Sequence, residues 1–208
     1  MKKGTKYLFI TNNIFMEKQA ALELIDFINE SPTNFHAILN IKKELIAHGF
    51  TQLFSGESWQ IERGKKYFVT KNHSSLYAFI PGTGDIAENG FKLICAHSDS
   101  PTFRIKPHAE IPVEGKYLKL NTEVYGGPIM YTWFDRPLSL AGRVILKGES
   151  ALHPVTRLLK IDNPILVIPH LAIHFNRSVN EGNPLSKQKD MLPILTRISG
   201  SLEANNLL

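Results

Sequence analysis

The sequence has little of several features that mark whole classes of protein. Its 208 residues include one cysteine, Cys95, so no disulfide can form within the chain, and this composition fits a reducing, cytoplasmic compartment. No run of apolar residues approaches the roughly 18 that a membrane-spanning helix needs. The net charge of +5 comes from scattered lysines and arginines, without a long basic run or a nucleic-acid-binding motif. We therefore expect neither a membrane nor a nucleic acid as a partner.

The remaining composition is that of an ordinary globular protein, with 43% hydrophobic and 21% charged residues, enough for a substantial core. In the first half, apolar residues recur at helical spacing and predict helices over Glu17–Glu30 and Phe35–His48. Thr33 or Asn34 can cap the second helix, and Gly49 follows its end. Apolar runs bounded by turn residues predict strands over Tyr67–Thr70, Ser75–Ile80 and Phe91–Ala96. This order of elements indicates an α/β fold.

The character of the sequence changes after Pro107. Glycine and proline become frequent, helical periodicity fades, and strands are predicted over Tyr117–Leu120, Gly142–Leu146, Val155–Ile161 and Ile165–Ile168. Residues 187–208 carry only a weak helical or loop signal. We therefore predict three segments: a non-native or disordered extension over residues 1–15, an α/β segment over 16–105, and a β-rich segment over 106–208.

One apolar run ends in two side chains that suit a metal centre. Phe91–Ala96 leads directly into His97, Asp99 follows two residues later, and Pro101 stops the run. Open α/β sheets place their ligand sites at the ends of buried strands, and a histidine can bind an ion through one ring nitrogen while a carboxylate holds the other. The same spacing also arises by chance where a strand runs into a polar turn. Cys95, inside the predicted strand, is expected to fill the core.

Four blocks of the sequence form an ordered set. They are AHSDSPTFRIKP over Ala96–Pro107, EVYGG over Glu123–Gly127, TWFDRPLSLAGRV over Thr132–Val144, and IPHLAIH over Ile168–His174. In this order they resemble motifs of the aspartyl aminopeptidase family, whose members are dinuclear zinc exopeptidases. The resemblance extends from about Glu17 to Leu195, nearly the whole chain.

The resemblance implies a fold and a metal site. Residues 16–105 would be the first part of a zinc-exopeptidase catalytic domain with a mixed sheet, and residues 106–208 a mainly β lid and dimerisation domain. His97 would bind one of two zinc ions, and Asp99 would orient it. The family's other ligands lie in downstream motifs that we do not find, since Glu203 is the only carboxylate after Leu195. We therefore expect the N-terminal half of a longer enzyme, inactive by itself.

His170 and His174 have the spacing of a helical zinc pair. The zinc-protease motif with this spacing needs a glutamate directly after the first histidine, and Leu171 stands there instead. Two histidines on an amphipathic surface segment remain one interpretation. The resemblance offers another, in which His170 reaches a neighbouring subunit's active site and hydrogen-bonds the substrate carbonyl as it becomes an oxyanion. His174 would then be structural, and the chain would form a homo-oligomer through its lid domain.

Three further features are weaker signals. The adjacent Asp135 and Arg136 indicate an ion pair that stabilises a loop, although Arg136 could instead bind substrate. Gly126 and its neighbour Gly127 are too few for a phosphate loop and indicate a backbone requirement. His36 matches a family position near a helix start, without a role that we can assign.

Together these observations predict a zinc-dependent aminopeptidase that removes an N-terminal, acidic residue from a peptide substrate. Two zinc ions would polarise the scissile carbonyl and lower the pKa of a bridging water. The alternative is a non-catalytic remnant or fragment that only folds and associates.

Overall fold

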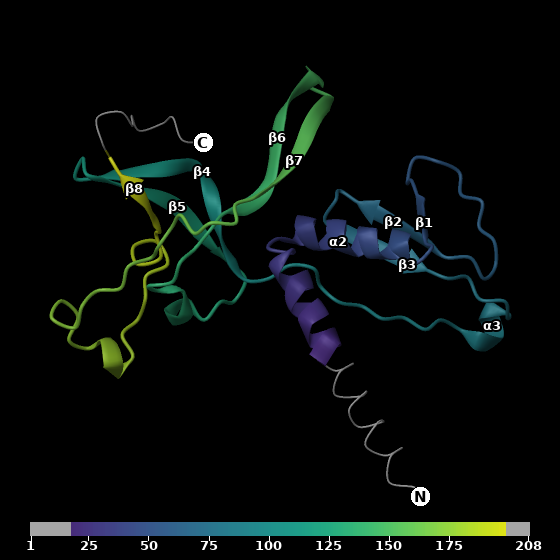
Figure 1. The fold of residues 1–208 in the computed structure, drawn as a ribbon, viewed down its shortest axis with the longest axis horizontal. Helices are drawn as coiled ribbons and strands as arrows, with labels where there is room; N and C mark the ends of the chain where they lie inside the picture. Colours follow the sequence, from purple (N-terminus) through teal and green to yellow (C-terminus); the bar gives the residue numbers. More distant parts are fainter. Residues whose placement is uncertain (1–17, 199–208) are drawn as a thin grey trace, which may run out of the picture. The chain divides into compact units, whose positions relative to one another are not determined.

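The fold divides into two compact units in the computed structural model, which describes residues 18–198 (Figure 1). The first unit holds the described residues up to Asp99, together with Gly142–Leu158. The second holds Ser100–Ala141 and the described residues from Leu159 onward. The predictions for residues 1–15 and for 199–208 lie outside the described residues. Within residues 18–198, no helix is both long enough and apolar enough to cross a membrane.

Two helices in the first unit confirm the helical predictions, one over residues 18–29 and the other, α2, over Asn34–Ala47. Thr33 is the residue that caps α2, because its side-chain oxygen accepts a hydrogen bond from the backbone N–H of His36 at 3.4 Å. The helix ends at Ala47, His48 is its C-cap, and Gly49 has a φ of 79°, which glycine adopts without steric cost.

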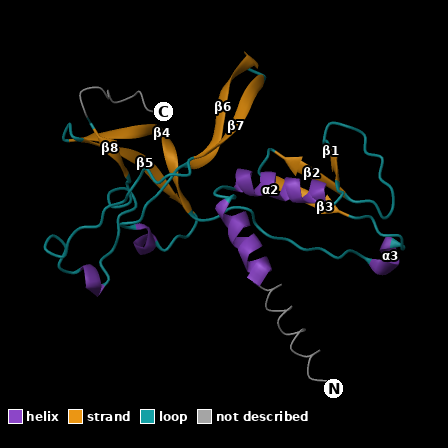
Figure 2. Ribbon diagram, viewed as in Figure 1, coloured by secondary structure: helices purple, strands orange, loops and turns teal. Residues whose placement is uncertain are grey.

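A three-stranded sheet lies beside α2 in the first unit (Figures 1 and 2). Strand β2 is central, parallel to β1 and antiparallel to β3, and a short helix, α3, follows the sheet. The bounds are β1 Thr51–Leu53, β2 Tyr67–Lys71, β3 Ser75–Phe79 and α3 Ile86–Asn89. Phe68 is fully buried on β2, and the ring of Tyr67 lies 5.6 Å from that of Phe79. These contacts form the core of the sheet.

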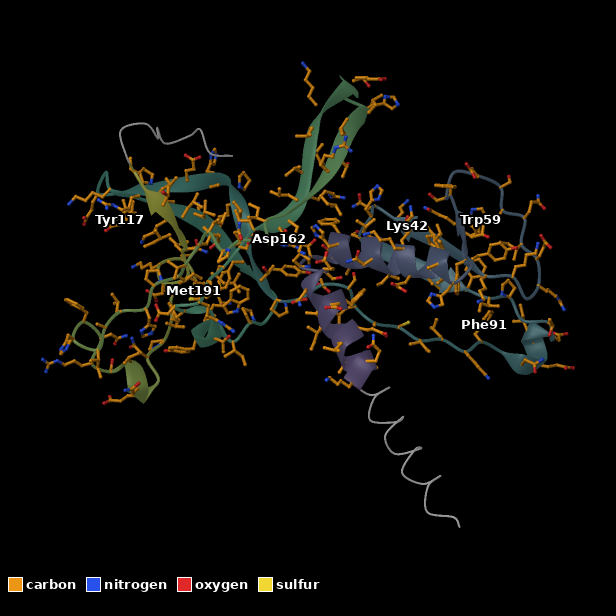
Figure 3. All side chains as sticks on the ribbon, viewed as in Figure 1. Lys42, Trp59, Phe91, Tyr117, Asp162 and Met191 are labelled. Atoms are coloured by element: carbon orange, nitrogen blue, oxygen red, sulfur yellow. The ribbon has the colours of Figure 1, made fainter. Side chains whose placement is uncertain are left out.

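The predicted buried strand over Phe91–Ala96 is wrong for this structure. The segment has neither helix nor strand, and the side chain of Phe91 is labelled on it in Figure 3. Phe91 is 81% exposed and Ile94 is 97% exposed. Cys95 is also exposed, so the expectation that it fills the core is wrong as well. An apolar run becomes a strand only where neighbouring strands satisfy its backbone N–H and C=O groups, and no strand among residues 18–198 pairs with this one.

The second unit is built on an antiparallel sheet in the order β4-β5-β8. The bounds are β4 Thr102–Val113, β5 Tyr117–Tyr125 and β8 Ile194–Arg197, with short 3-10 helices over Met130–Trp133 (η1) and Val179–Glu181 (η2). The register shifts between Ile105 and Glu110, around Pro107, whose ring nitrogen has no hydrogen to donate. Leu120 and Met191 are fully buried and form the centre of the core.

The three remaining strand predictions have different outcomes. Strands β6 (Ala141–Ser150) and β7 (His153–Lys160) form a two-stranded sheet, longer than the sequence predicts (Figure 2). Residues 165–168 make isolated bridges to Phe134, Leu138 and Ile194 and do not form a regular strand.

Candidate functional site

The imidazole of His97 faces Asp99 through one ring nitrogen. Its Nδ1 lies 2.7 Å from the backbone oxygen of Asp99 and 3.3 Å from the carboxylate oxygen Oδ1. The next residue, Ser98, donates a hydrogen bond from its hydroxyl to the backbone oxygen of Ser74, at 3.2 Å, in the turn between β2 and β3. A bond to the turn therefore holds the segment that carries His97, although the His97 side chain is 83% exposed.

This geometry decides which atom of His97 can bind a metal. Both oxygens of Asp99 that face Nδ1 can only accept a hydrogen bond, so Nδ1 carries the hydrogen in the neutral ring. The lone pair is then on Nε2, the nitrogen that a metal ion would take. The sequence predicts a carboxylate as the orienting group, and the structure places a backbone oxygen still closer to the ring.

The residues of the described part do not complete a metal site. Among residues 18–198, no three histidine, cysteine, aspartate or glutamate side chains gather closely enough to hold an ion. A catalytic zinc takes three protein ligands and keeps one position for water or substrate. His97 fits a zinc site as one ligand, and the remaining donors have to come from other residues.

The second candidate, His170, lies in the second unit against the block around Asp135. The backbone N–H of His170 donates to Oδ1 of Asp135 at 3.0 Å, and the N–H of Asp135 donates to the backbone oxygen of Ile168 at 2.9 Å. The rings of His170 and Phe134 meet edge to face, with centroids 4.6 Å apart at 84°. Two blocks quoted from the sequence, around Asp135 and around His170, are therefore neighbours in space.

The expectations for the residues around these blocks are partly wrong. Within residues 18–198, no ion pair joins Asp135 to Arg136, because the Asp135 carboxylate accepts from His170 and Arg136 donates to the backbone oxygen of Thr132 at 3.4 Å. His170 and His174 do not lie on a helix, so their spacing does not place them on one face.

The interpretation of Gly126 agrees with the structure. Its φ is 74°, and an added side-chain carbon would lie 3.4 Å from the backbone of Pro101. Glycine at this position lets the end of β5 lie close to the start of β4.

The sequence did not identify the bond between Asp135 and His170, which are 35 residues apart. Both residues belong to sequence blocks that resemble family motifs. However, nothing in either block shows that the two loops lie next to each other.

Comparison with known proteins identifies the family. The family described as "Aminopeptidase I zinc metalloprotease (M18)" matches residues 27–206. The chain belongs to the M18 family. The resemblance seen in the four sequence blocks is therefore confirmed.

Individual M18 relatives are longer than this chain. A "Probable M18 family aminopeptidase 2" of Clostridium novyi is 57% identical over 188 residues, which are 90% of this chain and 43% of that protein. A "Probable aspartyl aminopeptidase" of Ricinus communis is 43% identical, over 83% of this chain and 36% of that protein. The chain thus spans about two fifths of the length of these relatives.

Solved structures share the fold. The structure of the Ape4 and Nbr1 complex contains a chain that is 42% identical, with a TM-score of 0.81 over 86% of this chain and 34% of that one. The S. cerevisiae mApe1 dodecamer is 28% identical, with a TM-score of 0.69 over 85% of this chain and 38% of that one. The predicted mixed α/β fold is confirmed.

Proposed function

We propose that this chain carries one zinc ligand and one oxyanion-binding residue of an M18 aminopeptidase. The observation that carries the proposal is the geometry of His97, whose Nδ1 is held by Asp99 while Nε2 is left as the metal-binding atom. Membership of a family described as zinc metalloproteases supports zinc as the ion. We propose two ions in the complete site, with His97 as a ligand of one of them.

The chemistry of this chain's own residues follows from that placement. Asp99 fixes the tautomer and the direction of the His97 ring, and the zinc that the complete site holds would polarise the scissile carbonyl and a bound water. His170 would donate a hydrogen bond to the carbonyl oxygen as negative charge develops on it. Its Nδ1 lies 3.0 Å from the backbone oxygen of Leu171, an acceptor only, so donation from Nε2 requires a doubly protonated ring.

The proposed substrate is a peptide with a free N-terminus, from which one residue is removed. The four sequence blocks and the name of the Ricinus communis relative support an acidic N-terminal residue. A cytoplasmic location, expected from the single cysteine, stays a prediction.

We further propose a homo-oligomer in which residues 106–208 act as lid and dimerisation domain, and residues 16–105 belong to the catalytic domain. The S. cerevisiae relative is a dodecamer. Beside His170, the apolar side chains of Leu171, Ile173 and Phe175 are 61%, 52% and 82% exposed. Exposed apolar groups next to a proposed catalytic histidine are what an interface with another subunit would use.

A chimera provides the test. In this M18 chimera, our chain replaces the matching part of the Clostridium novyi relative. We expect the purified chimera to bind zinc and to cleave an aspartyl chromogenic amide. A folded chimera without zinc and without activity would instead support the alternative, a non-catalytic fragment. We keep that alternative because no three histidine, cysteine, aspartate or glutamate side chains among residues 18–198 gather closely enough to hold a metal ion.

A further inference from the structure

We propose that Asp135 is a positioning residue for His170, because it holds the loop that aims this histidine at its target. The inference rests on the proposed function, in which His170 binds the oxyanion. In this proposal Asp135 joins the residues of the site, although its carboxylate contacts neither metal nor substrate and acts only through His170.

The contacts form a two-point clamp around Pro169. Asp135 donates its own N–H to the backbone oxygen of Ile168, on one side of the proline, at 2.9 Å. Its Oδ1 accepts the N–H of His170, on the other side, at 3.0 Å. Hydrogen bonds to an ionised carboxylate are stronger than those between neutral groups. One residue therefore fixes the backbone immediately before and at His170.

The backbone of Asp135 points to the same conclusion independently. Its φ is 53°, in the left-handed region that residues other than glycine adopt infrequently. Such conformations persist where surrounding contacts enforce them, and they cluster at functional sites. Here the enforcing contacts are those to Ile168 and His170.

The neighbouring Phe134 restrains the ring itself. Phe134 forms a parallel bridge with Ile168, and its ring meets the His170 imidazole edge to face at 4.6 Å. The imidazole is thus held at the backbone by Asp135 and at the ring by Phe134, which limits the directions in which Nε2 can point.

The first measurement uses the unmodified 208-residue chain. If the clamp exists in solution, NMR should detect a scalar coupling across the hydrogen bond from the His170 amide nitrogen to the Asp135 carboxylate carbon. Absence of this coupling, with other amide–carboxylate couplings visible, would overturn the proposal.

Three variants separate the carboxylate from the backbone conformation. In Asp135→Gly, the glycine tolerates the left-handed backbone but has no side-chain oxygen to accept the hydrogen bond. We therefore expect the rate of hydrogen exchange at the His170 amide to rise about tenfold or more. Asp135→Asn retains an acceptor oxygen and should restore protection. Asp190→Gly is the matched control, because Asp190 accepts from the N–H of Ser186 at 2.7 Å in another loop of the same unit. Equal effects at His170 in Asp135→Gly and Asp190→Gly would contradict a specific clamp.

The M18 chimera then separates this inference from the proposed function. Asp135→Gly should lower kcat about tenfold with KM and zinc content little changed, and Asp135→Asn should recover most of the loss. If His170→Ala lowers kcat but Asp135→Gly does not, positioning by Asp135 is wrong and the proposed function stands. If the exchange results hold but His170→Ala leaves kcat unchanged, the clamp is real and the proposed role of His170 is wrong.

Discussion

The guanidinium carbon of Arg143 lies 4.2 Å from the centre of the Phe35 ring, within the first unit. The same guanidinium donates from Nη1 to the backbone oxygen of Asn72 at 3.0 Å and to its side-chain oxygen at 3.2 Å. Arg143 on β6 therefore joins the start of α2 to the turn between β2 and β3. One side chain thus contacts both segments, through a cation–π contact and through hydrogen bonds.

The first prediction is that Arg143→Ala lowers the free energy of unfolding by about 1–3 kcal/mol, through loss of the ring contact and of the bonds to Asn72. Arg143→Lys should recover only part of this, because an ammonium has no planar face to stack on the Phe35 ring while it donates to Asn72. Denaturant unfolding measures the change. Arg157→Ala is the control, since Arg157 is exposed on β7, and its effect should stay within about 0.5 kcal/mol. Equal effects of Arg143→Ala and Arg157→Ala would show that the contacts contribute nothing.

The second prediction is that the 208-residue chain alone has no peptidase activity. His97 is the only zinc ligand that we propose among the described residues, and no three donor side chains there gather closely enough to hold an ion. A catalytic zinc needs three protein ligands. The assay uses aspartyl and leucyl chromogenic amides with added zinc, manganese or cobalt. Metal-dependent turnover above the rate of heat-denatured chain would contradict the prediction.

The third prediction concerns the metal in the M18 chimera. His97→Ala should lose zinc and activity together, because Nε2 of His97 is the proposed ligand. Asp99→Asn should cost about tenfold, the low end for loss of an orienting partner, since the closer acceptor for Nδ1 is the Asp99 backbone oxygen, which the substitution keeps. Elemental analysis and kcat/KM report both effects. His153→Ala, an exposed histidine on β7, should leave zinc unchanged. Full zinc occupancy in His97→Ala would remove His97 from the site.

Local sequence patterns predicted the elements whose stabilising contacts are local. The helix α2 follows from its apolar spacing, its Thr33 cap and Gly49, and β2 and β3 follow from short apolar runs. Strand β4 was not predicted, and it runs through Pro107, where its register with β5 is irregular. Its formation depends on pairing with β5, which the local sequence does not show.

The failures concern contacts between distant residues. The apolar run over Phe91–Ala96 predicted a buried strand, yet burial requires neighbouring strands that residues 18–198 do not supply. For the candidate site, the sequence predicts His97, Asp99 and His170, and that prediction stays untested, but it does not predict the bond from His170 to Asp135. A motif indicates which chemistry a residue can perform. Its hydrogen-bond partner, 35 positions away in the sequence, depends on how two loops fold together.

The fourth prediction is that His170 acts across a subunit interface. It lies in the second unit, 73 positions from His97 by their numbers, beside apolar side chains that are exposed in the single chain. In the M18 chimera, His170→Ala should lower kcat by about 100- to 1,000-fold, the usual cost of losing one oxyanion donor, with zinc content unchanged.

Mixed oligomers decide whether His170 acts on its own subunit or on a neighbour. A His97→Ala subunit still has a His170 to offer, and a His170→Ala subunit still has its zinc ligand. If His170 works in trans, co-assembled subunits contain active sites that combine an intact His97 from one chain with an intact His170 from the other. Such mixtures should regain a fraction of the parent kcat that neither variant shows alone. Mixing after separate assembly, without subunit exchange, is the control and should recover nothing. If verified mixed oligomers also recover nothing while each variant is folded, His170 does not act on a neighbouring subunit, and its effect on kcat must arise within its own chain.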